Sequence, residues 1–242
     1  MLSKSQIKLI KSLSQKKYRA QHNLFTVEGV KGITEFLNSS FKLRHIYTTK
    51  VVFDVIDEDC SIISDIELKK ISQLKNPNTA LGVFEIPENK PVDMSQLIIA
   101  LDDVRDPGNL GTIIRLCDWF GVKDLLCSLA SVDCYNSKVV QATMGSLSRV
   151  NVSYVPLNDF LLKAGVAVFG TFMDGDNIYK TNLPEKGILV MGNEANGIST
   201  AIEALVIKRI AIPRFGSLKA TESLNVATAT SICLSEFKRK SI

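Results

Sequence analysis

The sequence has few metal-binding side chains and no long apolar run. It holds two histidines and five cysteines, and no two cysteines form a C-x-x-C pair, so we expect no metal site. No segment approaches the roughly 20 apolar residues that span a bilayer, and the first residues lack the apolar stretch of a secretion signal. We therefore expect a cytoplasmic protein in a reducing compartment, with no membrane partner.

The sequence also lacks the two common glycine-rich motifs that hold nucleotide phosphates. No G-x-G-x-x-G follows an expected strand, and no glycine-rich loop ends in the Lys-Ser or Lys-Thr of a P-loop. A nucleoside di- or triphosphate is disfavoured for this reason. The same absence argues against a nucleotide-dependent oxidoreductase on an open sheet.

Positive charge is concentrated near the beginning of the chain. The formal net charge is +4, and residues 4–31 carry seven lysines and arginines against one glutamate. Apolar residues recur near helical spacing within residues 7–13, which predicts a basic amphipathic helix. Its charged side could be a solvated face or an RNA-contacting face, and the sequence leaves both open.

The chain divides into two expected domains. Short strand-like runs alternate with helical ones in the first part, including a strand that begins at Leu24 and a helix at 30–37. Residues 84–93 carry two prolines and four charges, as a linker would. We place the boundary near residue 92, giving a small α/β domain at 1–92 and a second domain at 93–242.

The second domain is expected to be an α/β fold with a mainly parallel sheet. Nearly continuous apolar runs, bounded by polar segments, predict five strands at 97–101, 124–127, 166–170, 187–191 and 207–212. Helical patterns lie between them, at 110–120, 138–148 and 158–164. Strands of this composition alternating with helices are typical of a sheet that is covered on both faces.

Two of these strands lead into polar, glycine-bearing loops where ligands of open α/β sheets bind. In the first loop, Asn109 is a candidate N-cap after an Asp-Pro-Gly turn, and Arg115 follows on the helix as either a surface cation or a functional group. In the second, Glu194 lies between Gly192 and Gly197, whose backbone can approach a ligand closely. Glu194 could offset a cationic ligand or cap a helix.

The third polar segment precedes a helix rich in small residues, at 226–231. Ser223 or a neighbour can cap this helix. Asn225 falls in its expected first turn, where its helix propensity is poor. Either a capping role or a role in a site explains an asparagine there, and both interpretations stay open.

Together these three segments resemble the SpoU/TrmH family of SPOUT-superfamily methyltransferases, over about residues 96–240. The first family motif is matched within Asp-Pro-Gly-Asn-Leu-Gly-Thr-Ile-Ile-Arg, which ends at Arg115. The second is matched by the nine residues from Met191 to Ser199, and the third by Ile212-Pro213 with Ser223-Leu-Asn-Val. Three motifs in the same order are far more specific than one.

The resemblance implies a C-terminal trefoil knot, a homodimer and S-adenosylmethionine as the cofactor. The positions that match the family's cofactor-binding residues are Thr171, Gly192, Asn193, Gly197, Ile212 and Leu224. Those that match its catalytic residues are Asn109, Arg115, Glu194, Ser223 and Asn225. Because arginine holds its proton, we favour Arg115 as an electrostatic stabiliser or phosphate clamp over a general base.

The resemblance also implies an activity, the methylation of a ribose 2′-hydroxyl in structured RNA, and we favour ribosomal over transfer RNA. The run from Phe25 to Lys31 is similar to the ribosomal-protein-like substrate-binding domain that often precedes this catalytic domain. The alternative is a non-catalytic RNA-binding or ribosome-associated protein. Two features depart from the family pattern: the link Arg214–Glu222 is longer, and Gln141 stands where a basic residue is frequent.

Overall fold

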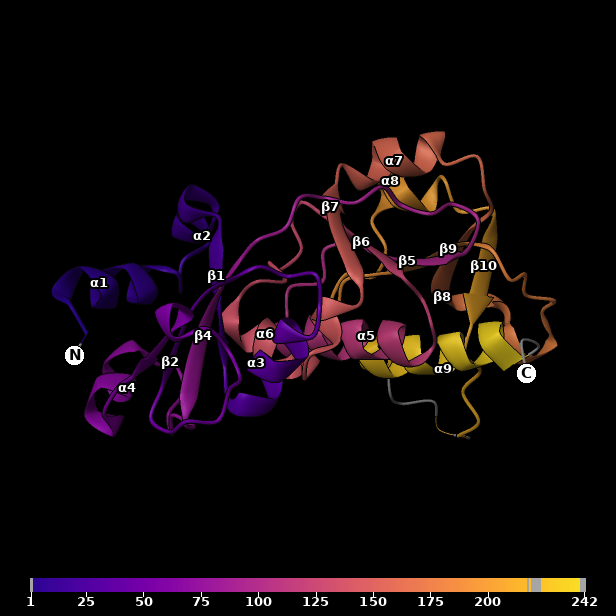
Figure 1. Ribbon diagram of the computed structural model, residues 1–242. Coiled ribbons are helices and arrows are strands. Elements are labelled where there is room, and N and C mark those ends of the chain that lie inside the picture. The colour runs from indigo at the N-terminus through magenta and orange to yellow at the C-terminus, as the bar shows by residue number, and fades with distance from the viewer. Residues whose placement is uncertain (1, 217, 219–222, 240–242) are drawn as a thin grey trace. The chain divides into compact units, whose positions relative to one another are not determined.

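The computed structural model describes residues 2–216, 218 and 223–239 (Figure 1), and they form two units. The first unit comprises Met1–Glu88 and Asp133–Arg149, and the second comprises Asn89–Val132 and Val150–Ile242. The chain first passes from one unit to the other between Glu88 and Asn89, near the boundary expected at residue 92. The return of residues 133–149 to the first unit has no counterpart in the sequence analysis.

The first unit is a four-stranded sheet with helices packed against it. Its helices are α1 (Lys4–Ser12), α2 (Lys16–His22), α3 (Val30–Leu37), α4 (Asp65–Ile71) and α6 (Ser137–Thr143), with short 3-10 turns η1 (Asp57–Asp59) and η2 (Ser146–Ser148). Its strands are β1 (Leu24–Glu28), β2 (Leu43–Thr48), β3 (Cys60–Ile62) and β4 (Ala80–Glu85), in the order β1-β4-β2-β3. Phe84 and Glu85, expected in a linker, instead end β4, because Phe84 is fully buried and pairs with Phe25 of β1.

Local capping fixes where two of these helices begin. Ser3 starts α1 and Ser64 starts α4, each in a capping box with the residue three positions later. At the second box the backbone N–H groups of Ser64 and Leu2 donate to the Glu67 carboxylate, and these bonds lower the pKa of Glu67 to about 2. Glu67 therefore joins the beginning of the chain to α4.

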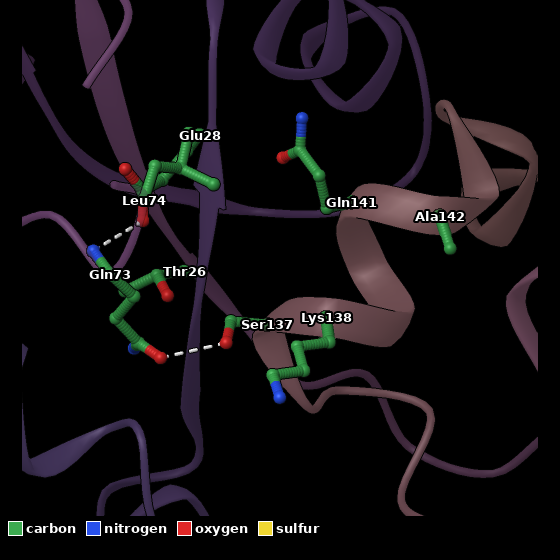
Figure 2. A pocket seen from close by; sticks show the side chains of 8 residues that line it. All are labelled: Thr26, Glu28, Gln73, Leu74, Ser137, Lys138, Gln141 and Ala142. Atoms are coloured by element: carbon green, nitrogen blue, oxygen red, sulfur yellow. Dashed lines mark hydrogen bonds between the residues drawn. The ribbon is translucent and has the colours of Figure 1, made fainter. Parts of the chain in front are cut away.

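The segment 133–149 completes the edge of the first unit's sheet at β1. The Tyr135 ring lies 4.7 Å from that of Phe25, and α6 runs beside β1. The helix expected at 138–148 is wrong beyond Thr143, because Met144 and Gly145 adopt left-handed backbone angles (φ 52° and 96°) that end α6. Between α6, β1 and residues 73–74 lies a hollow of about 320 Å³ (Figure 2).

The second unit is built on a six-stranded parallel sheet, which confirms the expected fold class. Its strands are β5 (Leu97–Leu101), β6 (Asp124–Ser128), β7 (Asn151–Val155), β8 (Val168–Asn177), β9 (Gly187–Met191) and β10 (Lys208–Ala211), in the order β10-β8-β9-β5-β6-β7. Its helices are α5 (Pro107–Trp119), α7 (Leu157–Lys163), α8 (Thr200–Glu203) and α9 (Val226–Lys238), with the short turn η3 (Ile178–Lys180). Figure 1 shows α5 and α9 on one face of the sheet and α7 and α8 on the other.

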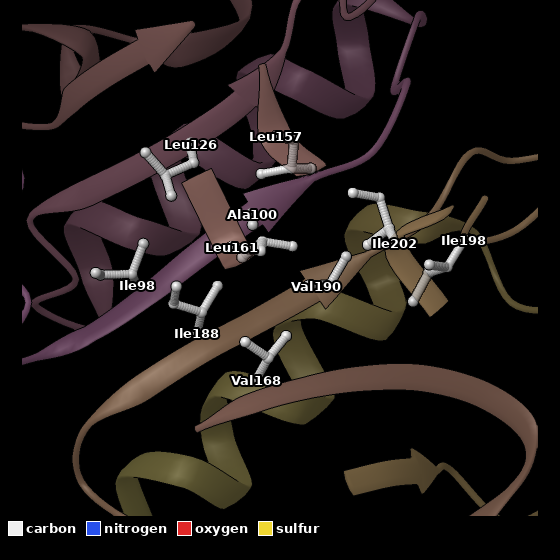
Figure 3. Packing of buried hydrophobic residues seen from close by; sticks show 10 residues of the cluster. All are labelled: Ile98, Ala100, Leu126, Leu157, Leu161, Val168, Ile188, Val190, Ile198 and Ile202. Carbon is white, nitrogen blue, oxygen red and sulfur yellow. The ribbon is translucent and has the colours of Figure 1, made fainter. Parts of the chain in front are cut away.

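The alternating side chains of the central strands form the core beneath α7 and α8 (Figure 3). Ile98 and Ala100 of β5 lie beside Ile188 and Val190 of β9, and all four are fully buried. The two strands pair in parallel, so their last residues, Leu101 and Met191, are neighbours. The chain leaves β5 toward β6 and leaves β9 toward β10, on opposite sides, which makes this pair a topological switch point.

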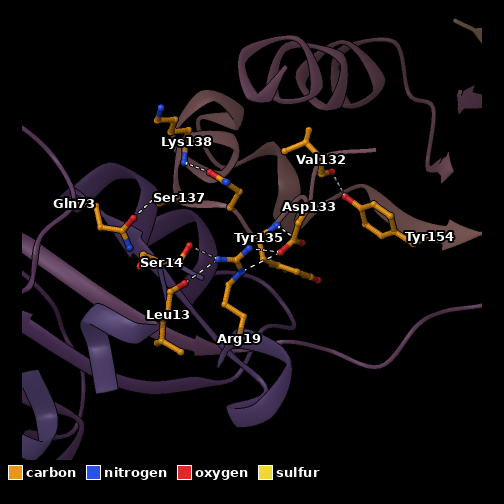
Figure 4. Close-up of polar contacts among 11 residues, drawn as sticks. Leu13, Ser14, Arg19, Gln73, Val132, Asp133, Tyr135, Ser137, Lys138 and Tyr154 are labelled. Atoms are coloured by element: carbon orange, nitrogen blue, oxygen red, sulfur yellow. Dashed lines mark hydrogen bonds and ion pairs between the residues drawn. The ribbon is translucent and has the colours of Figure 1, made fainter. Parts of the chain in front are cut away.

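The chain returns from the second unit to the first between Val132 and Asp133, and hydrogen bonds within each unit hold the residue on its side of this junction (Figure 4). In the second unit, the backbone of Val132 donates to the carbonyl of Val104 and accepts from the Tyr154 hydroxyl. In the first unit, the next residue, Asp133, accepts from the guanidinium of Arg19, with Nε 3.0 Å from Oδ2. Arg19 is 2% exposed and also donates to two backbone carbonyls at the end of α1.

We expect Asp133→Asn to lower the free energy of unfolding by about 3–5 kcal/mol, because it leaves the buried Arg19 charge without its carboxylate. Urea denaturation of the full chain measures this change. Asp176→Asn is the control: it breaks the exposed ion pair with Lys208 and should cost at most about 1 kcal/mol. Equal effects of the two substitutions would contradict the importance assigned to the buried pair.

Candidate active site

The loops after β5 and β9 are joined by hydrogen bonds at the switch point. The Asp102 carboxylate accepts from the backbone N–H of Ser199 at 2.7 Å. The Asn193 side-chain amide donates to the carbonyl of Asp103 at 2.7 Å. Asp103 adopts a left-handed backbone (φ 59°), a region that aspartate tolerates better than most residues. These bonds hold both loops at one edge of the sheet.

The second loop folds back tightly on the end of β9. The backbones of Asn193 and Gly197 exchange two hydrogen bonds of 2.9 Å, and the Asn193 side chain accepts from the N–H groups of residues 195 and 196. A Cβ atom at Gly192 would lie only 2.3 Å from the carbonyl carbon of Gly197. The loop can close in this way only with glycine at 192, so it presents backbone atoms at the site.

Asn109 connects the three predicted motifs through two side-chain hydrogen bonds. Its amide nitrogen donates to the Glu194 carboxylate at 2.7 Å, and its amide oxygen accepts from the Asn225 amide at 2.9 Å. The Asn225 oxygen in turn caps α9 by accepting from the N–H groups of residues 227 and 228. Asn109, Glu194 and Asn225, far apart in sequence, therefore form one polar cluster, which we call the asparagine cluster.

The structure corrects one prediction about a helix cap and decides a second. Asp106, and not Asn109, is the N-cap of α5, because its carboxylate accepts from the Asn109 backbone N–H. Asn109 is the third residue of the helix, which begins at Pro107. The Asn109 side chain is therefore not used for capping and is available to the asparagine cluster. At α9 the cap is Asn225, a neighbour of Ser223, as the prediction allowed. The two roles weighed for Asn225, capping and a site contact, both apply.

The remaining predicted residues make no hydrogen bond to this cluster within the described part of the chain. Thr171 donates from its hydroxyl to the carbonyl of Val190, at the end of β9. Ser223 and Leu224 are exposed beside Asn225, and Ile212 is half-buried after β10. Residues 217 and 219–222 of the longer link lie outside the described residues, so the expectation about that link stays a prediction.

Arg115 is exposed on α5, six residues after Asn109. Within residues 2–216, 218 and 223–239 its guanidinium makes no hydrogen bond or ion pair. The nearby Arg105 differs, because it donates to the Asp103 carboxylate at 2.7 Å, and this bond raises the pKa of Arg105. Arg115 is therefore an exposed cation, and this exposure fits both a surface cation and a functional group.

Sequence reasoning missed Asp102, which is 8% exposed and ties the first loop to Ser199. Its signal was its place directly after the apolar strand 97–101.

Among the described residues no group of three His, Cys, Asp or Glu side chains could hold a metal ion. No helix in the described part of the chain has the length and apolarity needed to cross a membrane.

Comparison with protein families gives two matches that together cover most of the chain. The pattern of the SpoU rRNA methylase family matches residues 96–235. That of the MRM3-like substrate-binding domain matches residues 4–82. The asparagine cluster falls entirely within the first match, and β1 to β4 begin within the second.

Individual relatives match over nearly the whole chain. The 23S rRNA (guanosine(2553)-2′-O)-methyltransferase RlmP of Bacillus subtilis is 30% identical over 92% of this chain and 91% of its own length. The structure of a Porphyromonas gingivalis protein, assigned to the TrmH family of RNA methyltransferases, is 37% identical with a TM-score of 0.91 over 99% of each chain. An AdoMet-bound rRNA methyltransferase from Sinorhizobium meliloti is 28% identical with a TM-score of 0.87, covering 100% of this chain and 98% of that one.

We expect Gly192→Ala to open the loop at 193–197, because the added methyl group meets the Gly197 backbone. The strain should cost about 1–3 kcal/mol. Hydrogen exchange of the loop amides should accelerate, and the thermal midpoint of the full chain should fall. Gly216→Ala is the matched control, since a Cβ there meets no atom of the described residues within 4 Å. Indistinguishable behaviour of the two variants would refute the close packing at Gly192.

Proposed function

Because this chain belongs to the SpoU rRNA methylase family, we propose that it methylates a ribose 2′-hydroxyl of RNA with S-adenosylmethionine as the methyl donor. The observation that carries the proposal is the asparagine cluster, which brings the three predicted motifs to the switch point of the sheet. Open α/β sheets bind their ligands at such a point.

The residues at this edge fit the proposed cofactor. The loop 192–197 presents backbone atoms, because Gly192 has no side chain and the Asn193 amide is turned inward to Asp103. Leu224, 48% exposed, and the half-buried Ile212 provide apolar surface. Polar backbone groups with apolar side chains are what an adenosine pocket requires. Gly192, Ile212 and Leu224 would hold the cofactor, which supplies an electrophilic methyl group on a sulfonium.

Methyl transfer requires the acceptor oxygen to be aligned with the methyl carbon and to become a better nucleophile. Asn225 orients Asn109 by donating to its amide oxygen, and the Asn109 amide nitrogen in turn donates to the Glu194 carboxylate. A carboxylate at that position can accept the hydroxyl proton. Arg115 would stabilise the negative charge that develops on the oxygen, or clamp an adjacent phosphate, without giving up its own proton.

The RNA is proposed to be ribosomal. The first unit matches a substrate-binding domain, and the relatives named above are rRNA methyltransferases or members of their family. α1 and α2 bring lysines to the surface of this unit, with Lys4, Lys8 and Lys11 along α1. Such cations favour a phosphate backbone without selecting a sequence.

Two structural features implied by the family are proposed with this activity. The knot is supported by the pairing of β10 with β8. Along β10 the pairing partner on β8 changes from Gly170 to Asp176 between one residue and the next, and a Cβ at Gly175 would lie 2.5 Å from the Ile210 backbone.

The homodimer is supported by Trp119, which is 84% exposed one helical turn after Arg115. A partner that covers Trp119 would approach Arg115 as well.

The activity is tested by incubating the purified chain with labelled S-adenosylmethionine and ribosomal RNA, followed by mapping of 2′-O-methyl marks. We expect one or a few marked riboses, absent from RNA treated without protein. S-adenosylhomocysteine should raise the thermal midpoint. RNA binding without methyl transfer, unaffected by cofactor, would instead support a non-catalytic RNA-binding protein.

Arg115→Ala should lower the turnover of methyl transfer roughly 100-fold to 1,000-fold, as the loss of one stabilising donor does elsewhere. Arg115→Lys should retain part of the activity, since it keeps the charge and loses the planar fork. Single-turnover kinetics at saturating RNA measures both. Arg239→Ala, an exposed arginine at the end of α9, should leave turnover unchanged. Near-wild-type turnover of both Arg115 variants would remove this residue from the chemistry.

A further inference from the structure

The hollow in the first unit is a second candidate binding site, distinct from the asparagine cluster. It measures about 320 Å³ and is lined only by residues of the first unit, from β1, from residues 73–74 and from α6 (Figure 2). Small-molecule sites in proteins begin at about 300 Å³. The hollow therefore has room for one planar ring system.

One wall of the hollow carries a buried carboxylate. Glu28 is 7% exposed, and its oxygens accept from the Ser72 hydroxyl and from the backbone N–H of Gln73 at 2.8 Å. These two bonds fix the carboxylate, and each oxygen keeps a lone pair for another donor. Among the described residues no lysine, arginine or histidine forms an ion pair with it. A buried carboxylate without a counter-charge favours a ligand that brings N–H donors.

Other residues that line the hollow carry hydrogen-bond donors. The Gln73 oxygen accepts from the Ser137 hydroxyl at 2.7 Å, a bond that orients the Gln73 amide and leaves its NH₂ group for a ligand. Lys138 and Gln141, both exposed, extend from α6 and line the same hollow (Figure 2). The hollow is therefore lined by a carboxylate acceptor together with amide and ammonium donors.

This arrangement selects among the parts of an RNA chain. A phosphate is unfavourable, because the Glu28 carboxylate would repel it. Guanine offers two adjacent N–H donors, N1–H and N2–H, for a carboxylate, and its O6, on the same edge, accepts from an amide or ammonium group. Adenine and cytosine each offer a single amino group on that edge, and uracil offers a single N–H between two carbonyl oxygens. Of the four bases, guanine alone brings two N–H donors for the carboxylate together with an acceptor for the donors of α6.

We propose that this hollow binds an unstacked guanine base of the RNA substrate by its Watson–Crick edge, with N1–H and N2–H donating to Glu28 and O6 accepting from Gln141. The inference rests on the proposed function, in that RNA is the substrate. Proteins that recognise RNA sequences commonly accept splayed bases in this way. The bound guanine selects the RNA, whereas the ribose to be methylated belongs at the asparagine cluster of the second unit.

The test measures binding of the full chain to three RNA heptamers, UUUGUUU, UUUIUUU and UUUAUUU, by fluorescence anisotropy at one fixed salt concentration. Inosine lacks the N2 amino group and so loses one bond to the carboxylate. We expect the guanine heptamer to bind roughly tenfold more tightly than the inosine heptamer, the usual effect of one hydrogen bond to a charged group. Equal affinities of wild-type protein for all three would overturn the proposal.

Two variants then locate the preference. Glu28→Gln should abolish the preference for guanine over inosine, while Glu35→Gln, a carboxylate of the first unit that pairs with Arg149 outside the hollow, should retain it. Gln141→Ala leaves the hydrogen bonds of Glu28 in place. This variant tests the proposal if Glu28→Gln does not fold. Gln141→Ala should lower the affinity for the guanine and inosine heptamers severalfold and leave the affinity for the adenine heptamer unchanged. A preference retained in Glu28→Gln, or guanine binding unchanged in Gln141→Ala, overturns the proposal.

Methyl transfer to ribosomal RNA, assayed in parallel, separates this inference from the proposed function. If wild-type protein transfers no methyl group but prefers the guanine heptamer, the proposed activity fails and the guanine site stands. If it transfers methyl groups and shows no preference, the guanine site fails and the activity stands. The heptamer assay contains no cofactor, so its result does not depend on catalysis.

Discussion

The parallel pairing of β5 with β9 is the constraint on which the candidate site depends. Residues 97–101 pair in register with residues 187–191, so both strands end at the same level of the sheet. Their loops can therefore exchange hydrogen bonds directly, and α5 starts where its first turn reaches Glu194. A slip of one residue would turn every side chain of a strand to the other face and separate these groups.

Asn225 shows why one residue type serves both the fold and the site. Its oxygen accepts from the first N–H groups of α9, while its nitrogen donates to Asn109. Aspartate at this position would cap the helix but has no donor, and serine is too short to reach in both directions. The stability of α9 and the assembly of the asparagine cluster are thus obtained from the same amide group.

The sequence predicted five of the six strands of the second unit because their signals are local, and it missed β7 (Asn151–Val155). Buried parallel strands are continuous apolar runs, and the segments at 97–101 and 187–191 are strands in the structure. Within the predicted site, Asn109, Glu194 and Asn225 come together, but no local pattern could reveal the two bonds that join them. The cap at Asp106 was missed because Asn109 has equal capping propensity. The end of α6 at Met144 depends on Gly145, where a Cβ would meet Glu35, a contact across 110 residues of sequence.

The return of residues 133–149 to the first unit has a consequence for the order of synthesis. β1 is an edge strand, and α6 can lie beside it only after residue 143 has been made. At about 5–20 residues per second, residue 135 follows residue 88 from the ribosome by roughly 2–9 seconds. Throughout that interval the growing chain presents Phe25 without the Tyr135 ring that later covers it. A nascent chain with an uncovered strand edge is a natural client for chaperones that bind at the exit tunnel.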